Sequence, residues 1–160
     1  METITIRPAI LSDYDAVSTL FEQVDRLHAD ALPTLFQSSE GPARSQEWFT
    51  QIEVSEDDAL FVAEHQGILV GLVLCQVRSS PAFALFVPRR SVHINDLVVQ
   101  EAFRGQGIGR SLVQRVHEWT HERGMTDVEL DVYEFNTSAR TLYEDLGYQT
   151  MRRTLWVHLP

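Results

Sequence analysis

The chain of 160 residues has the length of one ordinary domain, and we expect residues 1–160 to form a single domain. Its 13 basic and 23 acidic residues give a net charge of −10, which argues against a nucleic-acid partner because a phosphate backbone attracts a basic surface. A single cysteine excludes an internal disulfide framework and a cysteine-rich zinc site. No apolar stretch approaches the ~20 residues that span a bilayer, and the N-terminus lacks a signal-peptide pattern, so we expect a cytoplasmic protein with no membrane partner.

The first elements are predicted from alternation and helical spacing. Residues 3–7 alternate in polarity and end at Pro8, which indicates a short strand. Ser12 then opens a helix, with Asp15 three residues later as a capping-box partner. A second helix is expected over 44–52, after the prolines that interrupt the chain.

The middle of the chain predicts a hairpin and a long loop. Residues 60–64 and 68–77 indicate two strands, and Gln66-Gly67 between them indicates a tight turn. The segment from Ser79 to Arg90 contains two prolines and is predicted as a long loop. Long loops in compact domains are often functional.

The second half is more regular and completes the fold prediction. The predicted elements are a strand over 92–99, a helix over 108–122, a strand over 128–132, a helix over 137–146 and a last strand over 148–157. Gly124 and Gly147 follow the two helices at the usual stop position. The order β-α-α-β-β-β-α-β-α-β predicts a mixed α/β (α+β) domain built on a single central sheet.

A glycine-rich connection between a strand and a helix is the most informative stretch. Residues 98–111 read Val-Val-Gln-Glu-Ala-Phe-Arg-Gly-Gln-Gly-Ile-Gly-Arg-Ser. Glycine lets the backbone approach a ligand, and the start of the helix offers unpaired N–H groups at the positive end of its dipole. Arg104 and Arg110 add charged donors. The pattern indicates a site for a phosphate or pyrophosphate, with a plain tight turn as the alternative interpretation.

Two other phosphate-binding patterns fit poorly. A Walker loop ends in Gly-Lys-Ser/Thr, whereas Gly109 is followed by Arg110 and all 13 basic residues are arginine. A dinucleotide fingerprint starts directly after its strand, whereas five residues separate Val99 from Gly105. A nicotinamide-dependent oxidoreductase and an ATP-binding loop are therefore disfavoured.

Two spaced motifs resemble the signatures of the GNAT superfamily of N-acetyltransferases. The motif Arg104-x-x-Gly107-x-Gly109, after a hydrophobic strand, is similar to the family's acetyl-CoA signature. The motif Asn136-x-x-Ala139-x-x-x-Tyr143, followed by Leu146-Gly147-Tyr148, is similar to its companion signature. The resemblance covers about residues 92–149. It implies a GNAT-like sheet in which the fourth and fifth strands splay apart.

The resemblance implies acetyl-CoA as co-substrate and no metal. Backbone N–H groups from Arg104 to Arg110 would hold the pyrophosphate, and Val98 and Val99 would pair with the pantetheine arm. A backbone N–H near Val98 would stabilise charge on the thioester oxygen. Asn136 would bond to the arm, although its position also suits a helix N-cap. The implied cofactor-binding residues are Leu97, Val98, Val99, Arg104, Gly105, Gln106, Gly107, Ile108, Gly109, Arg110, Ser111, Asn136, Ala139 and Tyr143.

Tyr143 and Asp96 are the predicted catalytic residues. The resemblance implies that Tyr143 protonates the departing CoA thiolate, and a phenol is still protonated at neutral pH. The acceptor amine arrives protonated and needs a base, for which Asp96 on the fourth strand is the best candidate. We expect His93 and Asn95 on the opposite face of that strand if its alternation is unbroken. His93, His28 or a water chain are the alternative bases.

The predicted activity is transfer of an acetyl group from acetyl-CoA to a primary amine. The alternative is a non-catalytic acyl-CoA sensor on the same fold, which would need no acid at Tyr143. The acidic balance favours a small cationic amine such as a polyamine, docked between the first helices and the loop from Ser79 to Arg90. Arg89 and Arg90 favour an amino-acid-like amine instead, and a protein N-terminus is a third acceptor. Since relatives are often homodimers, a homodimer is also expected.

Two other features indicate structure rather than chemistry. Cys75 alternates with Val73 and Val77, as a buried strand residue does. His117 and His121 lie one helical turn apart without a third ligand nearby, so no metal site is predicted.

Overall fold

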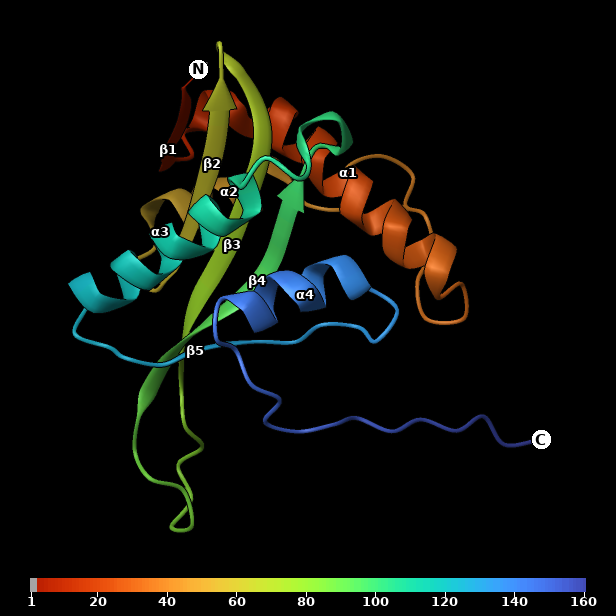
Figure 1. The fold of residues 1–160 in the computed structure, drawn as a ribbon, viewed down its shortest axis with the longest axis vertical. Coiled ribbons are helices and arrows are strands. Elements are labelled where there is room, and N and C mark those ends of the chain that lie inside the picture. The colour runs from red at the N-terminus through yellow and green to blue at the C-terminus, as the bar shows by residue number, and fades with distance from the viewer. Residues whose placement is uncertain (1–2) are drawn as a thin grey trace.

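A five-stranded mixed sheet with helices on both faces organises the chain, as Figure 1 shows for the computed structural model, which describes residues 3–160. The strands lie in the order β1-β2-β3-β4-β5; the first four are antiparallel, and β5 is parallel to β4. The strands are β1 (Ile4–Pro8), β2 (Asp58–His65), β3 (Ile68–Ser79), β4 (Arg90–Val99) and β5 (Val128–Leu130). The helices are α1 (Tyr14–Ala31), α2 (Gln46–Val54), α3 (Ile108–Glu122) and α4 (Thr137–Asp145). The mixed α/β prediction is confirmed.

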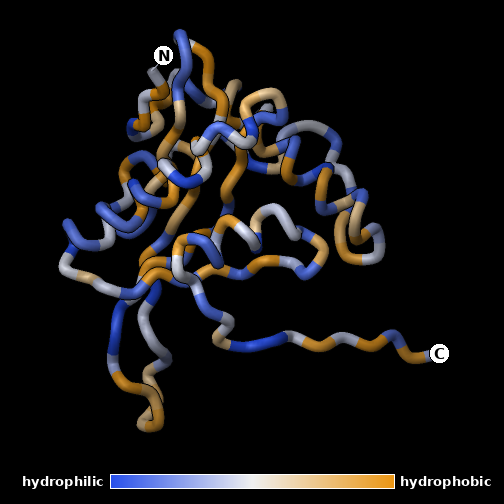
Figure 2. The backbone as a smooth tube through the Cα atoms, in the orientation of Figure 1, coloured by the Kyte–Doolittle hydropathy of each residue, from blue (hydrophilic) through white to orange (hydrophobic). Residues whose placement is uncertain are grey.

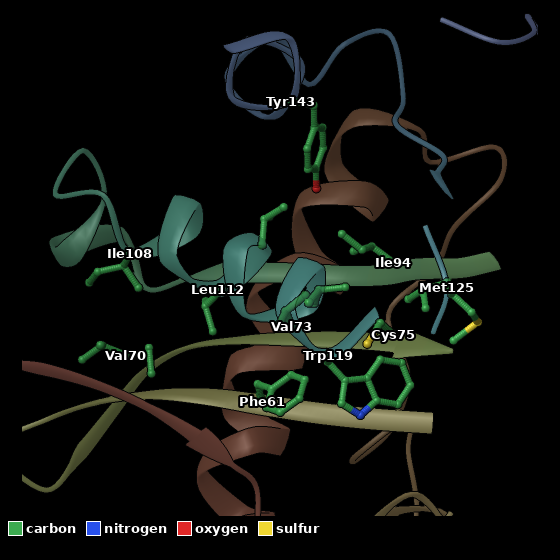
Figure 3. Packing of buried hydrophobic residues seen from close by; sticks show 14 residues of the cluster. Phe61, Val70, Val73, Cys75, Ile94, Ile108, Leu112, Trp119, Met125 and Tyr143 are labelled. Carbon is green, nitrogen blue, oxygen red and sulfur yellow. The ribbon is translucent and has the colours of Figure 1, made fainter. Parts of the chain in front are cut away.

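Two apolar layers bury the two faces of the sheet. One cluster lies between the sheet and the pair α3 and α4, and Figure 3 shows it with Leu112 and Trp119 of α3 near Val73 of β3. The other cluster joins the sheet to α1 and α2 through Leu20, Phe21 and other residues of the opposite face. No helix within residues 3–160 is long and apolar enough to cross a membrane.

The first helix begins differently from the prediction. A 3₁₀ turn, Leu11–Asp13, precedes α1, so the predicted capping box at Ser12 is wrong. The Asp13 carboxylate instead accepts hydrogen bonds from the Ile10 N–H at 2.9 Å and from the Arg7 guanidinium at 2.7 and 3.0 Å. The bond to Arg7 lowers the pKa of Asp13, which favours the charged carboxylate that holds this turn.

The hairpin between β2 and β3 contains the predicted tight turn. Gln66 and Gly67 both have positive φ, 49° and 77°, as a type I′ turn requires. Further along β3, Gly71 brings β4 and α3 unusually close. A Cβ added at Gly71 would lie 2.9 Å from the Val98 carbonyl oxygen and 3.2 Å from Cδ1 of Leu112. Glycine at this position therefore sets how closely β4 packs.

The predicted last strand over 148–157 is wrong. Residues 146–160 contain no helix or strand, and Figure 1 shows this segment running away from the body of the protein. Leu155 is 90% exposed and Trp156 is 69% exposed. The residues have strand-forming character, but a strand also needs an edge to pair with, and none of the strands within residues 3–160 pairs with this segment.

Candidate active site

The fourth and fifth strands separate where the site was predicted. β4 pairs with β5 only from Val92 to Ile94, opposite Val128 to Leu130. Beyond Ile94, β4 continues to Val99 with no strand of residues 3–160 on that side. The predicted splay is therefore confirmed, and it leaves an edge of β4 open to an extended ligand.

A β-bulge at Asn95 changes which way the polar residues of β4 point. Leu74 pairs with Asp96 and Cys75 pairs with Ile94, so Asn95 is the extra residue of the bulge. Val92 and Ile94 belong to the cluster under α3, and Val98 belongs to the cluster under α1. Asp96 thus shares the α1 face with Val98, and the alternation assumed for the strand is broken.

The bulge places His93 and Asp96 on one face instead of opposite faces. His93 Nδ1 lies 3.1 Å from Oδ1 of Asn95, and its Nε2 lies 3.2 Å from Oδ2 of Asp131. Both nitrogens of His93 are therefore engaged by neighbouring side chains. This arrangement makes His93 a weaker candidate for the base than Asp96.

Asp96 lies in a partly buried, charged environment on the α1 side. Burial raises the pKa of Asp96, and the nearby Arg44 and His28 oppose this shift while Asp25 adds to it. Arg44 Nη2 lies 3.8 Å from Oδ1 of Asp96, and Nη1 of Arg44 lies 2.8 Å from Asp25. A carboxylate with a raised pKa is a better proton acceptor than an exposed one.

Tyr143 reaches the same region from α4. Its side chain is 8% exposed, and Figure 3 shows the hydroxyl pointing from α4 toward β4. Burial raises the pKa of Tyr143 to about 12, and the charge of Asp96 adds to the shift. The phenol is therefore a neutral proton donor at neutral pH. The catalytic roles of Tyr143 and Asp96 stay predictions.

Two glycines shape the connection from β4 to α3. Gly105 and Gly107 have φ of 74° and 82°, which L side chains rarely adopt. Gly107 is the N-cap of α3, and no side chain caps this helix end. The first N–H groups of α3 are therefore available to a bound anion at the positive end of the helix dipole.

The side chains of Arg104 and Arg110, next to these glycines, contact other residues of the protein. Arg104 Nε donates to the Val99 carbonyl at 3.0 Å, and Nη2 of Arg110 lies 3.8 Å from Asp145. A Cβ added at Gly109 would lie 3.2 Å from Cδ2 of Leu142, so Gly109 lets α3 and α4 pack closely. The roles of Arg104, Gly109 and Arg110 in cofactor binding stay predictions. The backbone, more than these side chains, presents the donors at the helix start.

The remaining predicted cofactor-binding residues lie around the splay. Asn136 is the N-cap of α4, and its Oδ1 accepts from the Ala139 N–H at 3.2 Å. This capping leaves the amide nitrogen of Asn136 for another partner. Ile108 is buried in the core, and the Ser111 hydroxyl donates to the Gly107 carbonyl at 3.2 Å.

The loop from Ser79 to Arg90 lies away from this site. Figure 1 shows it projecting from the end of the sheet opposite to the glycine loop, where β3 ends and β4 begins. Arg89 forms an ion pair with Glu129, and Arg90 lies 2.9 Å from Asp57. The base of the loop thus lies near the end of α2, and the expected acceptor site between the first helices and this loop stays a prediction.

Other candidate groups have structural partners. Cys75 is fully buried, and burial raises the pKa of its thiol to about 12, so it is the strand residue that was predicted. His117 Nε2 lies 2.8 Å from the Tyr148 hydroxyl. Within residues 3–160, no group of three His, Cys, Asp or Glu is arranged to hold a metal ion. A hollow between α2, β2 and α3, next to Phe49 and Trp119, contains none of the predicted site residues.

The sequence interpretation missed Arg44 and a group of aromatic rings. Arg44 stacks over Phe21 of α1 at 3.9 Å from the ring centroid, which holds the guanidinium beside Asp96. His28 lies within 5.9 Å of three rings, measured between centroids, those of Phe36, Tyr133 and Phe135. No local pattern indicates these contacts, because they join segments far apart in the chain. The bulge did have a signal: Val92 and Ile94 alternate with polar residues, but the alternation stops at Asn95-Asp96 and gives way to three consecutive apolar residues.

The fold and this site define the class of protein, and comparison with known proteins identifies the family. A sheet that opens between parallel strands, beside an uncapped helix start, is what the two motifs predicted. Residues 21–148 match the model of the Acetyltransferase (GNAT) family, so the chain belongs to this family.

Individual relatives agree with this assignment. The chain is 32% identical over 100 residues to a probable N-acetyltransferase family 8 member 5 of Mus musculus. The aligned region covers 62% of this chain and 42% of that protein. The chain thus spans less than half the length of that relative. A solved tetramutant of a Bacillus halodurans protein has 28% identity and a TM-score of 0.90 over 97% of this chain and 99% of that one. An aminoglycoside N-acetyltransferase solved with CoA shares the fold, with a TM-score of 0.76 and 16% identity over 99% of this chain and 96% of that one.

Proposed function

We propose that this protein transfers an acetyl group from acetyl-CoA to a small cationic primary amine. The observation that carries the proposal is the separation of β4 from β5 after Ile94, with the Tyr143 hydroxyl directed toward β4 from α4. An acid placed at an opening for an extended ligand is useful to an enzyme and unnecessary to a sensor.

The residues around the splay fit acetyl-CoA, which supplies the acetyl group as a thioester. The uncapped N–H groups at the start of α3, behind Gly105 and Gly107, suit a pyrophosphate. The open edge of β4 from Asn95 to Val99 suits an extended arm, because backbone groups there pair as in an added strand. The free amide nitrogen of Asn136 provides a further donor.

Two side chains carry out the proton transfers of the proposed reaction. Tyr143 holds its hydroxyl proton at neutral pH and gives it to the leaving sulfur. Asp96 takes a proton from the acceptor ammonium on the α1 side of β4, directly or through a water molecule. The carboxylates of Asp25 and Asp96 outnumber the single charge of Arg44 there, which favours a cationic amine over an anionic one.

The proposal also includes the domain organisation, the cellular location and the oligomeric state of the protein. We propose that residues 1–160 act as one domain, that the protein works in the cytoplasm, and that it forms a homodimer. The shared sheet and its two packed layers support the first, and the acidic composition supports a soluble small-molecule enzyme.

A panel of amines tests the proposed activity. Release of free CoA thiol from acetyl-CoA is measured with diamines, polyamines, aminoglycosides, amino acids and a peptide N-terminus. We expect the fastest release with a di- or polyamine. Preference for an amino acid would contradict the cationic acceptor, and acetyl-CoA binding without thiol release on any amine would favour the sensor.

A further inference from the structure

Four aromatic rings from three separate segments of the chain meet in one group. The ring centroid of His28, on α1, lies 5.3 Å from that of Phe36 and 5.4 Å from that of Tyr133. Phe135, two residues after Tyr133, lies 5.9 Å from both of these last rings, that of His28 and that of Tyr133. Figure 2 shows hydrophobic colour in the segment after α1 and in the segment before α4. We call His28, Phe36, Tyr133 and Phe135 the ring cluster.

Backbone hydrogen bonds hold the segments that carry these rings. The Leu32 N–H donates to the His28 carbonyl at 2.8 Å, and the Phe36 N–H donates to the Leu32 carbonyl at 3.0 Å. The chain therefore turns back past the end of α1. At the start of α4, the Asn136 N–H donates to the Tyr133 carbonyl at 3.0 Å. Because these turns are already formed, a ligand that binds the rings does not need to order them.

The ring cluster adjoins the charged residues of the proposed acceptor site. Asp25 and His28 are three residues apart on α1, so they lie on the same face of this helix. Nη1 of Arg44 lies 2.8 Å from Asp25, and Nη2 of Arg44 lies 3.8 Å from Asp96. Tyr133 belongs to the segment after β5, the strand that separates from β4. The cluster therefore joins α1 to the far side of this separation, beside the charged group at Asp96.

The charges near Asp96 are balanced by one ammonium group. Asp25 and Asp96 provide two carboxylates, and the guanidinium of Arg44 neutralises one of them. The ring cluster itself contains no carboxylate. Glu134, which lies next to two of its members in the sequence, is 92% exposed and pairs with Arg140 at 3.0 Å. A second ammonium on the same ligand therefore needs an uncharged partner.

The faces of aromatic rings are such partners, because their negative quadrupole attracts a cation. The protein already uses this contact beside Asp96, where the Arg44 guanidinium lies 3.9 Å from the centroid of the Phe21 ring. Within residues 3–160, no arginine lies over a ring of the cluster. Tyr133 is 41% exposed and Phe135 is 36% exposed, so their rings are accessible to a ligand.

We propose that the ring cluster binds the second ammonium of a di- or polyamine whose first amine is acetylated beside Asp96. The inference rests on the proposed function for the position of the first amine. It assigns to His28, Phe36, Tyr133 and Phe135 the distinction between a diamine and a monoamine. The acidic residues attract any amine, whereas the rings add a contact that only the second ammonium makes.

Matched pairs of amines test whether a second ammonium is recognised. Diaminobutane differs from butylamine, and diaminohexane from hexylamine, by one terminal amino group. Release of CoA thiol gives kcat/KM for each amine, and the value for a diamine is halved because it has two equivalent ends. We expect the halved value to exceed that of the matching monoamine by about 2- to 30-fold, the factor that a cation–π contact supplies. Equal values in both pairs would overturn the proposal.

Variants of the rings separate their contribution from the attraction of an acidic protein for any dication. Tyr133→Leu and Phe135→Leu keep an apolar side chain but remove the ring face, so the preference for the diamine is expected to fall toward one. Trp156→Leu is the matched control, because Trp156 is 69% exposed and lies outside the ring cluster. This control is expected to keep the preference. A preference that persists in both cluster variants would assign it to charge alone and overturn the proposal.

Calorimetric titration distinguishes failure of this inference from failure of the proposed function. Diaminohexane, hexylamine and phenethylamine are titrated into the protein mixed with CoA, which permits binding without turnover. Tighter binding of diaminohexane that is lost in Tyr133→Leu, without thiol release from acetyl-CoA on any amine, would contradict the transferase and support the ring cluster. Thiol release without a diamine preference would contradict the ring cluster alone. Tighter binding of phenethylamine than of diaminohexane would also overturn the inference, because the rings would then receive another ring.

Discussion

At the scale of single residues, the site depends on two ionisable groups whose surroundings favour the neutral form. For Tyr143 the neutral form is the acid that donates a proton, and burial raises its pKa to about 12. For Asp96 burial raises the pKa above its ordinary value, while Arg44 limits the shift. Asp96 therefore remains able to ionise, yet holds a proton more readily than an exposed aspartate does.

Removal of the Tyr143 hydroxyl tests the proposed acid. Tyr143→Phe keeps the ring in the core but cannot donate a proton, so turnover is expected to fall by about 10²- to 10⁴-fold while acetyl-CoA binding persists. Free-thiol release and a binding titration measure the two quantities. Tyr148→Phe is the control, since it removes a half-buried hydroxyl bonded to His117. Full turnover of Tyr143→Phe would assign this tyrosine to packing.

The pH dependence of an Asp96 variant tests the proposed base. Asp96 accepts a proton only when ionised, and its raised pKa moves the acid limb of the rate to a higher pH than an exposed aspartate would give. Asp96→Asn is nearly isosteric and removes the base. Since an alkyl amine has a pKa of about 10.4, far more free amine is present near pH 9 than near pH 7. The loss of rate is therefore expected to be larger near pH 7.

Initial rates of acetyl transfer across this pH range measure the effect. Asp57→Asn is the control, because Asp57 is an exposed aspartate paired with Arg90 away from the site. An equal loss at both pH values would give Asp96 a structural role, through its contact with Arg44.

At the scale of elements, the geometry of β4 is decided by its two neighbours. The bulge at Asn95 turns Asp96 toward α1, and the short pairing with β5 ends at Ile94, just before the bulge. On the other side, Gly71 of β3 allows the Val98 backbone to lie unusually close. A change in any of these contacts alters the edge of β4 that is proposed to bind the extended arm of acetyl-CoA.

Substitution of Gly71 tests how closely β4 must pack. The Cβ of Gly71→Ala would lie 2.9 Å from the Val98 carbonyl oxygen, a backbone atom that moves only with its strand. Overpacking of this kind typically costs about 1–3 kcal/mol, so the free energy of unfolding in urea is expected to fall by that amount. Gly67→Ala has no neighbour within 4 Å and tests backbone strain alone. An unchanged stability of Gly71→Ala would mean that β4 can shift freely.

At the scale of the whole molecule, thermal stability tests which of acetyl-CoA, NAD and ATP the folded protein binds. A ligand that binds only the folded state adds about 2.7 kcal/mol of stability at a concentration of 100 Kd. Acetyl-CoA is therefore expected to raise the melting temperature in proportion to the logarithm of its concentration, whereas NAD and ATP are not. Thermal unfolding with each ligand measures this. Stabilisation by NAD or ATP in place of acetyl-CoA would contradict the proposed co-substrate.

The sequence by itself determined the features that depend on a few neighbouring residues. Helix α3 begins and ends where its apolar spacing and Gly124 predicted, and Asn136 caps α4 as its position suggested. The turn at Gln66-Gly67 and the splay implied by the two motifs are also confirmed. These features are predictable because helix ends and tight turns are formed by hydrogen bonds over three or four residues.

Only the tertiary structure decided what surrounds the predicted catalytic residues. Arg44 meets Asp96 across 52 positions of the chain, and the bulge that turns Asp96 toward it forms between β3 and β4. Residues 148–157 have the composition of a strand but form none, because no strand within residues 3–160 pairs with them. Contacts between distant segments depend on how whole elements pack, and that packing is a property of the assembled sheet rather than of any short pattern in the chain.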